Sequence, residues 1–135
     1  MKLFTGSIEV QMLLWSVVLG IAHLVIATSM SNWDLGLAYN ISSRDLPPGP
    51  VSPLTARLLR GFENFKETFV FFVVAALVVA LMARQSPMSA TGAQIYFWSR
   101  LAYVPVYAAG FVGVRTILWT LSMVGMVMVF LAAVA

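Results

Sequence analysis

Polar residues recur at helical spacing in one stretch of an otherwise apolar sequence. Within ARLLRGFENFKE, the residues Arg57, Arg60, Asn64 and Glu67 are three or four positions apart. At 100° per residue they fall within about an 80° sector of one helix face. Guanidinium, amide and carboxylate groups on one face favour a polar ligand that carries both charges.

A second polar pattern follows about thirty residues later. In YFWSRLAYVPVY, the residues Tyr96, Arg100, Tyr103 and Tyr107 also share one helix face. An arginine in the middle of an apolar helix costs at least a few kcal/mol unless it meets water or a counter-charge. We therefore predict a structural ion pair between Arg100 and Glu67. In ideal, vertical helices the two levels differ by roughly 10 Å, so tilt, long side chains or a neighbouring subunit must close the gap.

The composition indicates the solvent in which these residues act. Hydrophobic residues make up 61% of the 135, only 10% are charged, and the mean hydropathy is +0.92. A water-soluble domain of this length could not bury so much apolar surface, so we expect a lipid bilayer as partner. The eight basic residues are scattered, which argues against nucleic acid despite a formal charge of +3.

The chain has no cysteine. This excludes a disulfide framework, a Cys-ligated metal, covalent c-type haem attachment and a cysteine nucleophile. Any thiol chemistry must use a thiol that the substrate brings.

Four stretches are long and apolar enough to predict membrane-spanning helices of roughly 20 residues. Short links between them predict an all-α, up-down four-helix bundle in a single domain, residues 1–135. One long loop, rich in proline and glycine, is predicted at residues 31–53. The predicted spans are residues 8–28, 54–83, 95–114 and 116–135.

Basic residues near the span ends predict the orientation. With four spans, Lys2 and Arg84 fall on the side of the termini. The opposite side carries Arg44, Arg57, Arg60 and Arg115. The positive-inside tendency then places the long loop in the cytoplasm and the termini outside.

Together these two polar patterns resemble the MAPEG family, the membrane-associated proteins in eicosanoid and glutathione metabolism, and most closely its small bacterial members. The resemblance covers essentially the whole chain. The family pattern on the second span is Arg, three residues, Asn, two residues, Glu. On the third it is Arg, two residues, Tyr or His, three residues, Tyr, followed by an Arg at the start of the fourth span. The matching residues are Arg60, Asn64, Glu67, Arg100, Tyr103, Tyr107 and Arg115.

The resemblance implies a homotrimer in the bacterial inner membrane that binds glutathione near the cytoplasmic side, with no metal or haem. It implies a glutathione-dependent transferase or peroxidase that acts on lipophilic electrophiles, with Arg115 stabilising the attacking thiolate. The glutathione-binding residues would be Arg60, Asn64, Glu67, Tyr103, Tyr107 and Arg115.

Two alternatives stay open at this point. The chain departs from family members at Glu63, Thr68 and Trp119, which leaves room for a non-catalytic binding or scaffold protein with the same fold. An electron-transfer subunit with haem on His23 is the other alternative. A single histidine in an apolar helix is more often packed against a helix neighbour, so we expect no ligand role for it.

Overall fold

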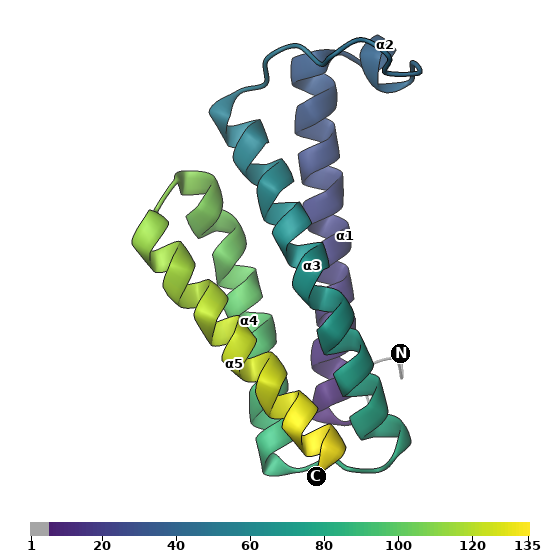
Figure 1. The fold of residues 1–135 in the computed structure, drawn as a ribbon, viewed down its shortest axis with the longest axis vertical. Coiled ribbons are helices and arrows are strands. Elements are labelled where there is room, and N and C mark those ends of the chain that lie inside the picture. Colours follow the sequence, from purple (N-terminus) through teal and green to yellow (C-terminus); the bar gives the residue numbers. More distant parts are fainter. Residues whose placement is uncertain (1–5) are drawn as a thin grey trace.

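The computed structural model describes residues 6–135, which contain helices and no strand. Four long helices run in antiparallel order along the molecule (Figure 1), and one short helix lies in the first loop. The helices are α1 (Ile8–Leu35), α2 (Leu37–Asn40), α3 (Pro53–Leu81), α4 (Pro87–Ala109) and α5 (Val112–Val134).

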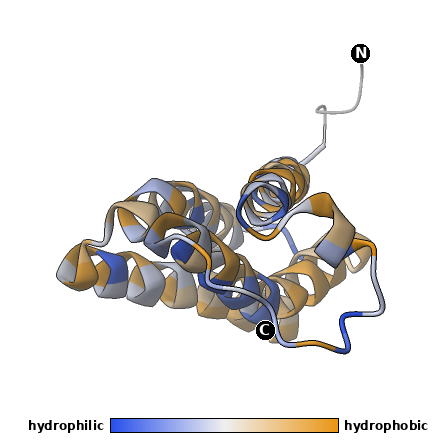
Figure 2. Cartoon of the chain, turned by 90° about the horizontal axis from the view of Figure 1, so that it is seen from above, coloured by the Kyte–Doolittle hydropathy of each residue, from blue (hydrophilic) through white to orange (hydrophobic). Residues whose placement is uncertain are grey.

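Three of these helices, α1, α3 and α5, are long and apolar enough to cross a membrane. They expose large side chains such as Ile21, Phe71 and Phe130, as lipid-facing helices do. Figure 2 shows hydrophobic residues over the outward faces of the helices and hydrophilic residues in the loop before α3. Helix α4 is as long as α5, with 23 residues, but it is less apolar and is not among the helices that could cross a membrane by this criterion.

Four predicted span boundaries differ from the helix ends by four residues or more; one of them is the start of the third span, where α4 begins at Pro87 instead of residue 95. The first span continues to Leu35 and ends only where Gly36 adopts φ 84°, so part of the predicted loop 31–53 is helical. The third span does not reach residue 114, because Gly110 takes the left-handed conformation and ends α4 at Ala109. Helix α5 consequently starts at Val112 and carries Arg115 in its first turn.

Serine and proline residues set the starts of α3 and α4. The Ser52 hydroxyl accepts a hydrogen bond from the Thr55 amide, and Pro53 occupies the first helical position. At α4, Ser86 and Ser89 form reciprocal bonds around the first turn. Helices α3 and α4 therefore each begin at a residue that is set by local hydrogen bonds.

The core fills the end of the bundle where the chain terminates. There the rings of Phe72 and Tyr96 stack with centroids 4.0 Å apart. Gly92 and Gly125 bring α4 and α5 into close contact, since a Cβ on Gly92 would lie 2.7 Å from the Gly125 carbonyl oxygen. Toward the other end, α3 and the α4–α5 hairpin line a polar cavity.

Candidate functional site between α3, α4 and α5

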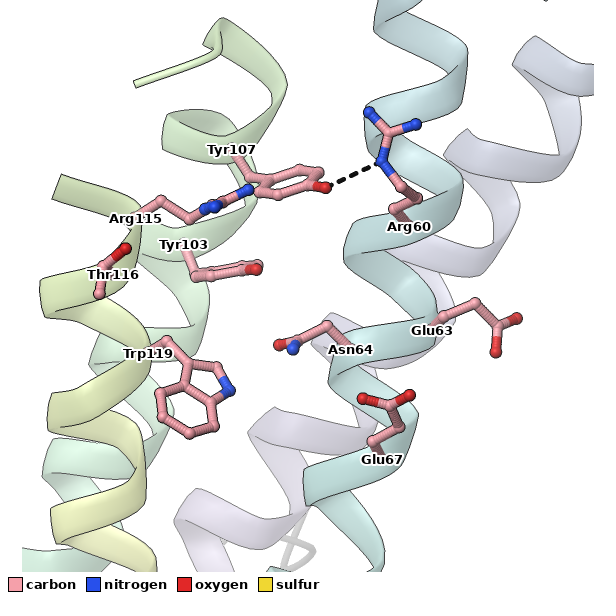
Figure 3. Close-up of a pocket in the computed structure, with 9 residues that line it drawn as sticks. All are labelled: Arg60, Glu63, Asn64, Glu67, Tyr103, Tyr107, Arg115, Thr116 and Trp119. Atoms are coloured by element: carbon pink, nitrogen blue, oxygen red, sulfur yellow. Dashed lines mark hydrogen bonds between the residues drawn. The ribbon is translucent and has the colours of Figure 1, made fainter. Parts of the chain in front are cut away.

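A cavity of about 420 Å³ lies between α3 and the α4–α5 hairpin. Its wall is polar and charged on the α3 side and aromatic and cationic on the other (Figure 3). The lining residues are Arg60, Glu63, Asn64 and Glu67 from α3, Tyr103 and Tyr107 from α4, and Arg115, Thr116 and Trp119 from α5.

All six residues predicted to share one site line this cavity. They come from three helices, α3, α4 and α5. On α3 and on α4, the spacing of three or four residues keeps the side chains on one helix face. The first turn of α5 brings Arg115 opposite Arg60 across Tyr107. Sequence patterns on separate spans thus converge in one place.

Tyr107 connects the two cationic residues of the cavity. Its hydroxyl oxygen accepts a hydrogen bond from Arg60 Nε at 3.0 Å. The Arg115 guanidinium lies over its ring, 5.0 Å from the centroid. The Tyr103 ring stacks beside it, with centroids 5.5 Å apart and planes 16° from parallel. Because the Tyr107 oxygen accepts from Arg60, its hydrogen is available to a ligand.

The predicted ion pair between Glu67 and Arg100 is absent from residues 6–135 of the structure. Arg100 Nη1 instead donates to Asn64 Oδ1 at 2.8 Å. The two side chains fail to meet because Arg100 packs against the ring of Tyr103, while Glu67 faces the cavity. The carboxylate of Glu67 is thereby left accessible to a ligand.

Glu63 is an acidic residue of the cavity that sequence reasoning did not assign to the site. It forms a salt bridge with Lys66 at 2.7 Å, and both side chains are more than half exposed. In Figure 3 its carboxylate points away from α4 and α5. Its repulsion of an anionic ligand is therefore partly offset by Lys66 and by solvent.

Thr116 and Trp119 are the other residues that the predicted site omitted. They are three positions apart on α5, and Trp119 follows Arg115 by one helical turn. Helical periodicity from Arg115 could have found Trp119. In the sequence, Trp119 was noted only as a departure from the family pattern and was not assigned to the site.

A smaller cavity of about 230 Å³ adjoins the first and shares Arg60, Tyr107 and Arg115 with it. Arg57, the first residue of the polar stripe, lines this second space. Arg57 Nη1 also donates to the Ala108 carbonyl oxygen at 3.2 Å, near the end of α4. Three guanidinium groups therefore surround the mouth of the site.

His23 lies outside both cavities. Its Nε2 is 2.9 Å from the carbonyl oxygen of Leu58, and its ring packs edge-on against Phe62. A carbonyl oxygen only accepts, so Nε2 carries the hydrogen and links α1 to α3. Residues 6–135 contain no cluster of three or more His, Cys, Asp or Glu residues that could hold a metal ion.

The arrangement can bind a ligand with charges of both signs. Arg60 and Arg115 suit carboxylate or thiolate groups, Glu67 suits an ammonium group, and Asn64 suits an amide. The model for the MAPEG family matches residues 12–135, which include α3, α4, α5 and every residue of the cavity. The chain belongs to the MAPEG family. A search of curated proteins and of solved structures finds no match to it.

Family membership and three apolar helices establish a MAPEG membrane protein. A membrane-embedded, glutathione-related function follows at the level of the family. The bilayer is accordingly the solvent for the exposed apolar faces of α1, α3 and α5.

Proposed function

We propose that this MAPEG protein is a glutathione-dependent transferase or peroxidase that acts on lipophilic electrophiles. The observation that carries the proposal is the convergence of Arg60, Asn64, Glu67, Tyr103, Tyr107 and Arg115 on one cavity. Glutathione carries two carboxylates, an ammonium group, amides and a thiol, and the cavity has a partner for each of them.

The roles of the residues follow from their charges and positions. Arg60 holds a carboxylate, Glu67 receives the ammonium group, and Asn64 binds an amide or carboxyl oxygen. The hydroxyls of Tyr103 and Tyr107 add donors on the opposite wall. Arg115 stands on α5 at the other side of Tyr107 from Arg60, where it can hold the sulfur.

In the proposed reaction the thiol loses its proton to water and Arg115 stabilises the thiolate. An adjacent guanidinium lowers the pKa of a thiol because it favours the charged form. The thiolate attacks an electrophilic carbon, a carbon–sulfur bond forms, and the leaving group departs with its electron pair. With a hydroperoxide, the thiolate attacks the terminal oxygen, the O–O bond breaks, and the alkoxide leaves as an alcohol after taking a proton from water. The resulting sulfenic acid reacts with a second glutathione, which gives the disulfide and releases water.

An apolar groove supports delivery of the electrophile from the bilayer. It has a volume of about 450 Å³ and lies between α3 and α5. Val70 and Phe71, which line it, follow Glu67 of the polar cavity by three and four residues on α3. A lipophilic molecule in this groove would lie next to the bound glutathione.

The proposal includes α4 as a fourth membrane span and a homotrimeric assembly. Helix α4 has 23 residues, about 34 Å at 1.5 Å per residue, enough for the hydrocarbon core. Three of its polar residues, Ser89, Ser99 and Arg100, are buried against the other helices, so lipid does not contact them. The low hydropathy of α4 is therefore compatible with a span.

The orientation that we propose places the loop before α3 in the cytoplasm of a bacterium, with the C-terminus outside. Its basis is the excess of basic residues around that loop and the mouth of the site. Single cysteines at the exposed positions Ser43 and Gln85 should label from opposite faces of the membrane. Labelling of Ser43 from outside would overturn this orientation.

A non-catalytic binding or scaffold protein is the second candidate. It is favoured by Thr68, which lies beside the site in sequence but is buried and 3.4 Å from the Tyr96 hydroxyl rather than in the cavity wall. Trp119 likewise offers an indole to the cavity instead of a phenol. Fewer hydroxyl donors would weaken catalysis more than binding.

Thermal melting of the purified protein in detergent tests the proposal. A ligand at 100 times its dissociation constant stabilises by about 2.7 kcal/mol, so millimolar glutathione should raise the melting temperature measurably. Glycylglycine, which lacks the thiol and the γ-glutamyl group, should have little effect. Arg60→Ala should abolish the shift, because a carboxylate anchor is lost.

Arg44→Ala is the matched control. Arg44 donates to the Asn40 carbonyl oxygen in the exposed loop and lines neither cavity, so this variant removes the same charge outside the site. It should keep the full glutathione shift. If wild-type protein shows no shift at millimolar glutathione, the transferase proposal fails and the scaffold alternative replaces it.

A further inference from the structure

Arg100 is a buried cation without an anionic partner. Only 1% of its surface is exposed. Its guanidinium lies 4.5 Å from the ring centroid of Tyr103 and 5.6 Å from that of Phe65. Within residues 6–135 no carboxylate forms a salt bridge with it, and its buried Nε has no hydrogen-bond partner. A buried charge in this state is strongly unfavourable.

The hydrogen bond from Arg100 fixes the orientation of Asn64. A guanidinium only donates, so the group of Asn64 that meets Arg100 Nη1 at 2.8 Å must be the carbonyl oxygen. The two N–H bonds of the Asn64 amide are then left for other partners. Since Asn64 lines the cavity, it presents a hydrogen-bond donor to whatever the cavity holds.

Arg100 also supports the opposite wall of the cavity. It packs against the ring of Tyr103, which lines the cavity and stacks on Tyr107. The positive charge of Arg100 is thus separated from the cavity by only two side chains, Asn64 and Tyr103. In a low-dielectric environment its field reaches across them and favours an anion in the cavity.

We propose that Arg100 is a positioning residue that holds Asn64 as a donor toward the ligand, and that the counter-charge of Arg100 is an anionic group of the bound ligand. The inference rests on the proposed function, in which that group belongs to glutathione. It assigns Asn64 to an oxygen or thiolate of the ligand and excludes an N–H group as its partner. It also predicts that the protein without ligand is less stable than it would be with the charge of Arg100 paired.

Asn64→Asp tests both halves of the inference. The substitution is isosteric and places a carboxylate at the atom that Arg100 already contacts. Without ligand, the variant should melt at a temperature about 3 °C or more above that of wild type, because the buried guanidinium gains its ion pair. Its dissociation constant for glutathione should rise at least about tenfold, because the donor and the unpaired charge are both lost.

Asn32→Asp is the matched control. Asn32 Oδ1 also accepts a hydrogen bond, from Asn40 Nδ2 at 2.7 Å, at the end of α1 and away from the cavity. This variant adds the same negative charge to the same kind of contact, without a buried guanidinium. It should show no rise in melting temperature and an unchanged dissociation constant for glutathione.

The preference of the site for an anionic over a neutral ligand tests the electrostatic role of Arg100, because a purely structural role would leave this preference unchanged. Glutathione diethyl ester has neutral carboxyl groups, so the ratio of its dissociation constant to that of glutathione reports the preference for anions. This ratio should fall at least about threefold in Asn64→Asp and in Arg100→Gln, and should be largely kept in Arg100→Lys.

Two results would overturn the inference: melting of Asn64→Asp at or below the wild-type temperature, or glutathione binding by it within threefold of wild type. Absence of any glutathione effect on the wild-type protein would instead refute the proposed function. The unliganded melting temperatures still decide the inference in that case. A rise in Asn64→Asp supports an unsatisfied charge on Arg100, and no rise overturns it.

Discussion

At the scale of single residues, sequence spacing predicted which side chains share a helix face, but not the hydrogen-bond partner of each side chain. The stripe of Arg60, Asn64 and Glu67 was visible in the sequence because helical periodicity alone determines a shared face. The partner of Arg100 was not predictable, because it depends on which side of Tyr103 the guanidinium packs. Charge complementarity suggested Glu67, whereas packing brought Arg100 to the neutral Asn64.

A buried acidic residue at the opposite end of the bundle gives a prediction at the same scale. Glu9 of α1 is 1% exposed and accepts a hydrogen bond from the Ser89 hydroxyl of α4. Ser89→Ala removes this donor and also the bond that the Ser89 hydroxyl accepts from the Ser86 amide at the start of α4, and should lower the free energy of unfolding by about 1–3 kcal/mol. Denaturant titration in detergent micelles would measure the change.

Ser122→Ala is the control for this prediction. The Ser122 hydroxyl is also buried, but it donates to the Trp119 carbonyl oxygen within its own helix. Loss of that bond leaves no buried charge unpaired, so the effect should stay below about 1 kcal/mol. Equal losses in the two variants would contradict a special contribution of the Ser89 hydroxyl, which serves both Glu9 and the start of α4.

At the scale of helices, the sequence predicted their number and order better than their ends and contacts. Short links predicted antiparallel neighbours, and α4 and α5 are indeed joined through Gly110 and Phe111. The end of α1 was missed because the apolar run stops near residue 28, although no proline or glycine interrupts the helix between there and Gly36. The close approach at Gly92 and Gly125 was also missed, since it depends on the relative rotation of two helices.

The contact between α4 and α5 leads to a prediction on its small residues. A Cβ on Gly125 would lie 2.5 Å from the Gly92 carbonyl oxygen and 2.7 Å from the Tyr96 amide nitrogen. Gly125→Ala should therefore push the two helices apart and destabilise the protein by about 1–3 kcal/mol. Because α4 and α5 carry one wall of the cavity, glutathione binding should weaken as well.

Gly113→Ala is the control that separates the steric clash at Gly125 from the general effect of replacing glycine by alanine in a helix. Gly113 also lies in α5, but a Cβ there would meet nothing within 4 Å. Alanine favours a helix over glycine by about 1 kcal/mol, so this variant should be neutral or slightly more stable. Thermal melting of both variants in detergent would compare them. A neutral Gly125→Ala would contradict the close packing of α4 and α5.

At the scale of the whole molecule, composition alone predicted a membrane protein, since 61% hydrophobic residues leave no other solvent. The family match over residues 12–135 confirms the predicted MAPEG membership. The predicted homotrimer remains a prediction, because a subunit interface depends on surfaces of neighbouring chains. In the proposed trimer, an adjacent subunit completes the site at the cavity between α3 and the α4–α5 hairpin.

In the proposed mechanism, this cavity binds glutathione and holds its sulfur as a thiolate beside Arg115. Ultraviolet difference absorbance of the protein saturated with glutathione near neutral pH measures that thiolate directly. We expect a thiolate band with wild-type protein and its loss in Arg115→Ala, although this variant should still bind glutathione through Arg60. A thiolate band of equal size in Arg115→Ala, or none in the glutathione-bound wild-type protein, would contradict the claim.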